Sequence, residues 1–255
     1  MLFFFVLLVA LVVSVVPSTP DRQALPVLAV PACPTTGSVT YNTSVPDKSL
    51  FPLTQVDLCY DNSAIHIKFT AFEEKDFYYN QSLSTNGEIY NYEVMEAFIY
   101  HGTNDPQTYL EFEVAPNNVT FQAFKHRAKS SFVRDQTPYQ VLDKLTLGAA
   151  VYNPSKVRAA GAAFDRFYIT DLAADAITAS TTLDYADDLW VSNVQIPLGL
   201  FNVDNGTAQG TEWRMNFFRT VTGPSTFPNQ SYGSWSPPDE VNFHMTPFFG
   251  DVVFV

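Results

Sequence analysis

Apolar and polar residues alternate along much of the chain, which is the pattern of β-strands that bury one face. In one run, Ile65, Ile67 and Phe69 alternate with His66 and Lys68. Other segments share this alternation or the β-branched and aromatic composition of strands. These further strand candidates are residues 93–100, 110–114, 119–122, 177–182, 190–196, 212–220 and 251–255.

Segments rich in Pro, Gly, Asn and Asp separate the strand candidates. Between residues 110–114 and 119–122 lies Ala115-Pro116-Asn117-Asn118, whose turn chemistry predicts a hairpin. Short helical turns are expected only at residues 171–175 and 197–201. We therefore predict an all-β chain, a single-domain antiparallel β-sandwich of the jelly-roll or immunoglobulin-like kind that spans residues 33–255.

The first residues are typical of a secretory signal peptide. Residues 2–16 are apolar except for Ser14, and no charged residue occurs before Asp21. This run falls short of the ~20 apolar residues that span a bilayer. We expect a signal peptide over residues 1–18, with cleavage as late as residue 32, then a secreted, extracellular protein with no membrane association.

Two further features fit secretion. Cys33 and Cys59 are the only cysteines, and an oxidising compartment favours a disulfide between them over two buried free thiols. The glycosylation pattern Asn-x-Ser/Thr occurs five times, each time beside turn-forming residues. The five acceptor asparagines are Asn42, Asn80, Asn118, Asn205 and Asn229.

The formal net charge of −12 argues against a nucleic-acid partner, because phosphate binding requires concentrated Lys and Arg. Residues 125–149 differ from the rest: they hold five of the fourteen basic residues. Strand periodicity stops after Phe124, and aromatic character resumes at Val151-Tyr152. We expect an atypical insertion that forms a flexible or poorly packed loop. A partner-binding loop is the alternative, because its charge is opposite to that of the body.

Several segments carry a family resemblance. They are residues 92–99 (YEVMEAFI), 109–116 (YLEFEVAP) and 212–219 (EWRMNFFR), followed by Ser234-Trp235-Ser236-Pro237, Phe243-His244 and Phe249-Gly250. In order and spacing, the chain from about residue 33 to 255 resembles the family 9 carbohydrate-binding modules and their secreted stand-alone relatives. The resemblance implies a sandwich that holds a glycan end between aromatic faces, with calcium sometimes stabilising loops.

The resemblance also implies which residues contact the sugar. By motif position, the carbohydrate-binding candidates are Tyr90, Glu96, Asn216, Arg219 and Trp235. Trp235 lies in a loop-like stretch where it has no obvious core role, which favours a stacking platform. The alternatives are a cross-strand aromatic for Tyr90 and a structural network or ion pair for Asn216 and Arg219. Trp213 and Trp190 are expected in the core.

Enzymatic activity is not expected. Two pairs of carboxylates, Glu111 with Glu113 and Glu93 with Glu96, are of the type that glycosidases use. However, Glu111 and Glu113 alternate with apolar residues as on a solvated sheet face. The chain also has no Gly-x-Ser-x-Gly elbow, no His-Glu-x-x-His and no phosphate loop.

No cofactor and no metal ligands are assigned. A haem-binding redox module would use axial Met and His, but Met95 and Met215 lie in strands that look like core. Calcium could use Asp184, Asp187 and Asp188, although no EF-type spacing occurs. The expected function is a non-catalytic protein that binds a poly- or oligosaccharide. The main alternative is an extracellular structural or interaction sandwich without sugar binding.

Overall fold

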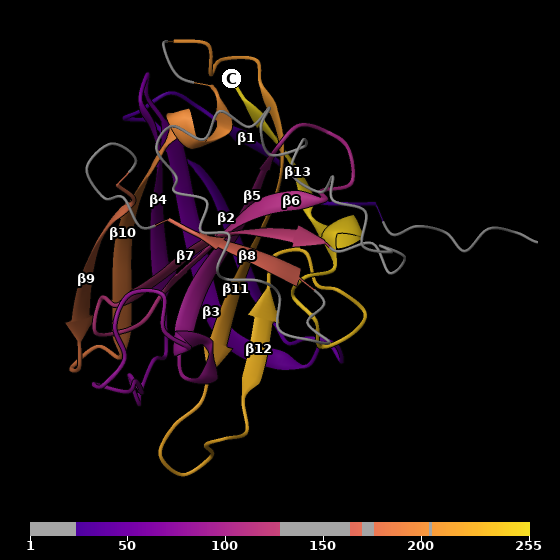
Figure 1. Cartoon of the computed structure of the whole chain (residues 1–255). Helices are drawn as coiled ribbons and strands as arrows, with labels where there is room; N and C mark the ends of the chain where they lie inside the picture. Colours follow the sequence, from indigo (N-terminus) through magenta and orange to yellow (C-terminus); the bar gives the residue numbers. More distant parts are fainter. Residues whose placement is uncertain (1–23, 128–163, 170–175, 204–205) are drawn as a thin grey trace, which may run out of the picture.

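The computed structural model describes residues 24–127, 164–169, 176–203 and 206–255, which form two β-sheets packed face to face (Figure 1). The larger sheet runs in the order β1 (Val27–Val30), β13 (Gly250–Phe254), β11 (Glu212–Val221), β5 (Val94–His101), β6 (Thr108–Val114), β7 (Thr120–Arg127) and β8 (Phe164–Tyr168). A further short strand, β12 (Ser231–Ser234), also pairs with β11.

The smaller sheet runs in the order β2 (Gly37–Thr43), β3 (Leu50–Tyr60), β4 (Ala64–Ala71), β10 (Leu189–Pro197) and β9 (Thr178–Asp184). All named strand pairs are antiparallel except β1 with β13. The 3-10 turns are η1 (Ile89–Asn91), η3 (Leu198–Phe201) and η4 (Thr246–Phe248). The predicted all-β sandwich is confirmed. Within the described residues, no helix is long and apolar enough to cross a membrane.

The core lies between the two sheets and is built from alternate residues of each strand. On β4, Ile65, Ile67 and Phe69 face inward, as their spacing predicts. Phe69 meets Phe217 of β11 edge-on, with ring centroids 6.3 Å apart, so the two sheets interlock there. Trp190 and Trp213 are both buried in this core, as expected.

The larger sheet is buried on its outer face as well. There Phe98, Tyr109, Phe218 and Phe249 form a second apolar cluster, against which Phe243 packs from the segment after β12. A third cluster joins the segment around η1 to the strands and contains Ile89, Val94, Ala115, Phe121 and Ala123. The outer face is therefore covered at two places and is not a solvated surface.

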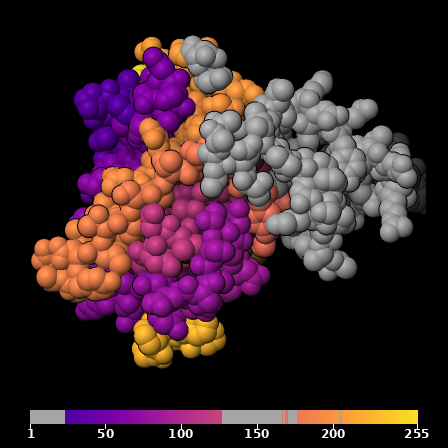
Figure 2. All heavy atoms as spheres, turned by 60° about the vertical axis from the view of Figure 1, so that its left-hand side comes forward, coloured from indigo at the N-terminus to yellow at the C-terminus, as the bar shows by residue number. Residues whose placement is uncertain are grey.

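The β6–β7 hairpin is confirmed, and neighbouring segments hold its turn in place. In Figure 2 the magenta turn lies between the orange β9 region and the purple residues that precede β5. The Asn118 side chain donates to the Ala179 carbonyl of β9 at 3.2 Å. On the other side, the Asn86 amide donates to the Thr120 carbonyl at 2.9 Å.

The other predicted strands are confirmed within a residue or two, but β1, β2, β3, β8 and β12 were not predicted. β1 and β12 have only four residues each, too few for a periodic pattern. The end of β7 is a correction: the strand continues to Arg127, so Lys125 belongs to the sheet and not to the insertion. The rest of the 125–149 prediction lies outside the described residues, as do the signal peptide and the turn at 171–175.

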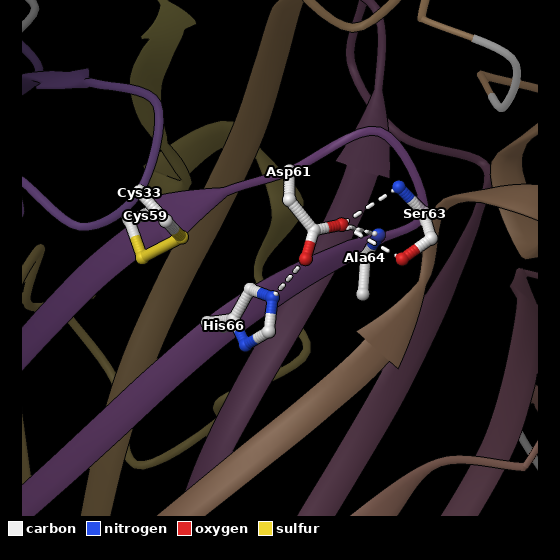
Figure 3. Close-up of a disulfide and its surroundings, with 6 residues drawn as sticks. All are labelled: Cys33, Cys59, Asp61, Ser63, Ala64 and His66. Carbon is white, nitrogen blue, oxygen red and sulfur yellow. Dashed lines mark hydrogen bonds and ion pairs between the residues drawn. A yellow bond between two sulfur atoms is a disulfide. The ribbon is translucent and has the colours of Figure 1, made fainter.

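The Cys33–Cys59 disulfide is confirmed (Figure 3). It ties the segment after β1 to the end of β3. Beside it, one Asp61 carboxylate oxygen accepts from the Ser63 amide and hydroxyl and from the Ala64 amide, at 2.7–2.8 Å. The other oxygen contacts His66 Nε2 at 2.7 Å. These bonds lower the pKa of Asp61 below its ordinary value despite partial burial, and they fix the β3–β4 turn.

Candidate functional site

A pocket of about 260 Å³ opens on the outer face of the larger sheet, between the two apolar clusters. Its floor carries charged side chains from neighbouring strands. Its walls are mainly aromatic and come from η1, β5, β12 and the segment after β12. The floor residues are Glu96, Glu111, Glu113 and Lys125, Arg166 lies at the rim, and the main wall residues are Tyr90, Phe98, Tyr232, Phe243 and His244.

The strand register brings three carboxylates together on the floor. Glu96 of β5 lies directly opposite Glu113 of β6. Glu111 lies two residues before Glu113 and therefore points to the same face of the sheet. One oxygen from each of the three lies within 4.8 Å of the other two. All three side chains are buried, with at most 4% of each residue exposed.

Two cations accompany these carboxylates. Lys125 of β7 forms a buried ion pair with Glu111, and its Nζ lies 5.2 Å from the centroid of the Phe121 ring. Arg166 of β8 is opposite Lys125 in the register and is exposed. Its guanidinium lies over the ring of Tyr90 at 5.9 Å, which places it at the rim of the pocket.

Burial shifts the pKa values of the charged groups on the floor. It raises the pKa of Glu96 to about 8, although Lys125 and a hydrogen bond from Thr220 act in the opposite direction. Burial and the neighbouring Glu96 raise the pKa of Glu113 well above its ordinary value, against the effect of Arg166. Burial also lowers the pKa of Lys125 to about 7. At neutral pH the floor therefore holds a proton that isolated carboxylic acids would have released.

His244 joins the floor to the wall. Its Nδ1 is hydrogen-bonded to the Tyr109 hydroxyl at 2.6 Å, and its ring stacks on Phe98 with centroids 5.3 Å apart. Its Nε2 lies 3.8 Å from Glu111 Oε1. Burial, together with the positive charges of Lys125 and Arg166, lowers the pKa of His244 to about 3. The imidazole is therefore neutral at physiological pH.

The remaining walls are held by stacking and hydrogen bonds. Phe243 stacks on Phe218 with centroids 4.0 Å apart, and Tyr232 meets Phe243 edge-on at 5.4 Å. The Tyr232 hydroxyl donates to Gln230 Oε1 at 2.9 Å, and Gln230 Nε2 donates to the Tyr90 carbonyl at 2.8 Å. The aromatic walls are therefore fixed before any ligand enters.

Of the five carbohydrate-binding candidates from the sequence, the structure places Tyr90 and Glu96 together in the pocket. Asn216 is buried beside the turn after β12. Its Nδ2 donates to the Ser236 carbonyl at 2.8 Å, and its Oδ1 accepts from the Ser236 amide at 3.0 Å. This is the structural network given above as the alternative, so we reassign Asn216 to holding the turn.

Arg219 and Trp235 also lie away from the pocket lining. Arg219 points to the opposite face of β11, where it is fully buried and pairs with Glu74 at 2.9 Å. It also donates to the Phe72 carbonyl at 3.0 Å. Trp235 is partly buried against the core, with its ring 5.7 Å from that of Phe217. Both side chains therefore make contacts within the protein, and neither lines the pocket.

Sequence reasoning missed most of the floor. Glu111 and Glu113 were interpreted as a solvated surface, and this was wrong: 4% and 1% of these residues are exposed. The sequence did contain a sign that this sheet face is buried. Phe98 and Phe218 lie on the same sheet face as these carboxylates, and large outward-facing aromatics indicate a face that another segment covers.

Other candidate groups from the sequence lie elsewhere. Glu93 does not line the pocket: it lies near Glu74, and burial with that neighbouring charge raises the pKa of Glu93 to about 9. It accepts from the Tyr78 and Thr222 amides. Met95 and Met215 are buried in the core between the sheets, as expected, and not on the pocket face.

No protein-family model matches the chain. A relative named extracellular protein, from Arthroderma benhamiae, is 48% identical over 230 residues, which cover 90% of this chain and 91% of the relative. Among solved structures, a Bacteroides uniformis protein inferred to bind carbohydrate has a TM-score of 0.57 at 15% identity, over 90% of this chain and 99% of that chain.

Family 9 carbohydrate-binding modules from Caldicellulosiruptor kristjanssonii are also similar. One, solved with cellotriose, has a TM-score of 0.52 at 11% identity, over 90% of this chain and 93% of that one. Another, solved with glucose, has a TM-score of 0.53 at 11% identity, over 90% of this chain and 96% of that one. At such identities the likeness concerns the fold. The chain therefore has the fold of the family 9 carbohydrate-binding modules, and by sequence it belongs to the same family as the extracellular protein of Arthroderma benhamiae.

Proposed function

We propose that the protein is a secreted, non-catalytic carbohydrate-binding protein whose pocket takes the terminal sugar ring of an oligo- or polysaccharide. The observation that carries this proposal is the pocket itself, which combines aromatic walls with a buried polar floor. Modules of the same fold have been solved with cellotriose and with glucose, which supports a saccharide as the ligand.

The chemistry of the pocket suits a sugar ring. The C–H faces of a sugar stack on aromatic planes, which Tyr90 and Phe243 offer, while its hydroxyls need fixed donors and acceptors. Carboxylates accept, and Lys125 and a protonated carboxylic acid donate. At about 260 Å³ the pocket is smaller than the roughly 300–1,000 Å³ of sites for drug-sized ligands, so we expect one ring to enter.

The floor does not favour hydrolysis. A glycosidase places its two carboxyl groups on either side of the glycosidic bond. Glu96 and Glu113 instead lie side by side across one strand pair, so a ring would rest on both. The third carboxylate, Glu111, is paired with Lys125. We therefore assign these groups to binding.

Secretion is supported by several independent features. The apolar leader and the Cys33–Cys59 disulfide suit an exported chain, and the relative from Arthroderma benhamiae is named an extracellular protein. Three of the acceptor asparagines, Asn42, Asn118 and Asn229, are exposed. Expression in a eukaryotic host should give secreted protein that lacks the leader and loses mass on treatment with an N-glycosidase. Retention of the full chain inside the cell would contradict secretion.

Calorimetry and glycan arrays test the binding function. The protein is titrated with mono- and oligosaccharides and screened against soluble and insoluble polysaccharides. Replacing Tyr90 by Ala removes an aromatic wall and should weaken binding about fivefold or more, because stacking of this kind contributes on the order of 1 kcal/mol. The Glu212→Gln variant, changed at an exposed site on β11, is the control and should bind like the wild type.

Absence of binding to every sugar by the correctly folded wild type would reject the proposal. It would leave the structural or interaction sandwich as the better account. Equal binding by wild type and Tyr90→Ala would place any sugar site outside this pocket.

A further inference from the structure

We infer that the pocket selects a sugar that carries a protonated primary amine, such as a deacetylated hexosamine at the end of a chain, over the neutral sugar of the same shape. This inference rests on the proposed carbohydrate-binding function and names the ligand class of that site. It follows from the charge, the hydrogen bonding and the geometry of the floor.

The charges of the pocket do not balance when every carboxyl group is ionised. Three carboxylates, Glu96, Glu111 and Glu113, lie on the floor, against the two cations Lys125 and Arg166. Lys125 is already committed to Glu111 in a buried ion pair. When all three carboxylates are ionised, the pocket therefore carries one uncompensated negative charge.

The other titratable groups that face the floor do not supply the missing positive charge. The pKa of His244 is lowered to about 3 by burial and by the nearby cations, so its imidazole is neutral. Burial raises the pKa values of Tyr90 and Tyr232, so both phenols are neutral as well. In the free protein a proton held by the floor carboxyl groups balances this charge, and a ligand with a single positive charge can take the place of that proton.

Among the described residues, two floor oxygens lack a hydrogen bond, and one of them, Glu111 Oε2, lies in the ion pair with Lys125. Glu113 is 1% exposed, and no described residue donates to its Oε2. A buried carboxylate oxygen without a donor is costly, and native proteins rarely keep one without a reason. Glu113 lines the pocket, so a ligand can supply the donor.

The spacing of the carboxylates matches an ammonium group better than a hydroxyl. Three oxygens no more than 4.8 Å apart can all lie within about 2.8 Å of one point, which is the length of a charge-assisted N–H···O bond. An ammonium has three N–H donors and no acceptor, so it can serve all three carboxylates at once. A hydroxyl has one donor, and an N-acetylated nitrogen has one N–H and a bulky substituent.

The walls are compatible with the same ligand. Phe98, Tyr232 and Phe243 line the pocket beside the floor. Aromatic rings attract cations through their negative faces and also stack on sugar C–H groups. The same walls therefore favour the body of the sugar and its positive charge.

A divalent metal ion is the competing occupant for three clustered carboxylates. Its charge would lie beside the Lys125 ammonium, which contacts Glu111, and close to Arg166. Two positive charges next to a doubly charged ion oppose its binding, whereas one ammonium meets the charge deficit. We therefore favour the amine.

The test compares three matched probes by calorimetry at about pH 6.5, where the amine is protonated: D-glucosamine, D-glucose and N-acetyl-D-glucosamine. We expect D-glucosamine to bind at least about tenfold more tightly than either neutral sugar. Repeating the titration in buffers of different ionisation enthalpy should reveal release of up to about one proton with D-glucosamine, because the cation ionises a floor carboxyl group. D-glucose should release none.

Two isosteric variants locate the effect. Glu113→Gln and Glu96→Gln should each lower the affinity for D-glucosamine at least about tenfold, because either change removes a carboxyl group that the cation can ionise while keeping the shape of the side chain. Affinity for D-glucose should change less than about threefold in both, since an amide still hydrogen-bonds a hydroxyl. The Glu212→Gln control should behave like the wild type, and thermal unfolding verifies that each variant is folded.

The outcomes separate this inference from the proposed function. If D-glucose binds as tightly as D-glucosamine, the amine preference is overturned while carbohydrate binding stands. If no sugar binds, both fail. If Ca²⁺ or Mn²⁺ alone binds to the wild type and not to Glu113→Gln, the floor is a metal site and the inference is overturned. Unchanged D-glucosamine affinity in both folded variants also overturns it.

Discussion

Two groups of buried charged residues in this molecule are built differently. Arg219 and Glu74 form an ion pair inside the protein, and backbone carbonyls accept the remaining guanidinium hydrogens on one nitrogen. On the pocket floor, Glu113 keeps an oxygen without a donor. Arg219 also keeps one buried nitrogen, Nε, without an acceptor among the described residues, but it lies away from the pocket, so we assign this group to structure. Glu113 lines the pocket, where its unpaired oxygen can accept from a ligand.

Replacing Arg219 by Met tests the structural role. The change leaves Glu74 buried without its cation, which should lower the free energy of unfolding by about 3–5 kcal/mol. Urea denaturation measures the loss. The matched control is Lys68→Met, an exposed cation on β4, which should change stability by less than about 0.5 kcal/mol. A loss below about 1 kcal/mol in Arg219→Met would contradict the assignment, as would a specific loss of sugar affinity in the folded variant.

At the scale of elements, the strands could be predicted where one face is apolar and the other polar. β4 and the β6–β7 hairpin follow from their alternation. The pocket could not be predicted in the same way. Its floor depends on the register of β5 with β6, which pairs Glu96 with Glu113. This register depends on contacts between strands that are distant in sequence, so the local residue pattern does not reveal it.

The walls depend on contacts between distant segments. Phe243 reaches Phe218 and His244 reaches Tyr109 only because the segment after β12 folds back over the sheet. The prediction that Arg219 binds sugar failed for a related reason. It was based on the motif that the chain shares with the family 9 modules, whereas the alternation of residues along β11 puts Arg219 on the inner face with Phe217. The sequence thus identified the strands that carry these residues. Which face of the strand each side chain lies on determines whether it reaches the pocket.

The disulfide is the covalent link between elements, and its removal gives a separate prediction. Cys33 and Cys59 are 26 residues apart, so their bond restricts the unfolded chain by about 3–4 kcal/mol in the loop-entropy model. The double Cys33→Ser, Cys59→Ser variant should lose stability of this order in urea denaturation, and its sugar affinity should be unchanged because neither cysteine lines the pocket. Reduction of the wild type should reproduce the loss. An unchanged unfolding midpoint would be inconsistent with this role.

For the whole molecule, the pocket reduces stability at neutral pH. The pKa of Glu96 is about 8 in the folded protein, above the ordinary value of 4.5, so the folded state keeps a proton that the unfolded state releases. This group's contribution therefore makes the protein less stable as the pH rises from about 4.5 to about 8. The cost is what we expect of a site prepared for a ligand that the free protein lacks.

The Glu96→Gln variant removes this titration. Its melting temperature relative to wild type should increase as the pH is raised from about 5 to about 8, by about 4 °C or more, because glutamine stays neutral in both states. Scanning calorimetry across this range measures the difference. The Glu212→Gln control should show no such trend. A difference that stays constant or shrinks with pH would show that Glu96 is not held protonated by its burial.

A crystal structure of the protein soaked with its tightest-binding sugar tests the central claim most directly. The account predicts one terminal ring in the pocket on the outer face of the larger sheet, resting on Glu96 and Glu113 with Tyr90 and Phe243 against its faces. A sugar bound anywhere else, for example beside Trp235 or on the smaller sheet, with the pocket left to solvent, would contradict it.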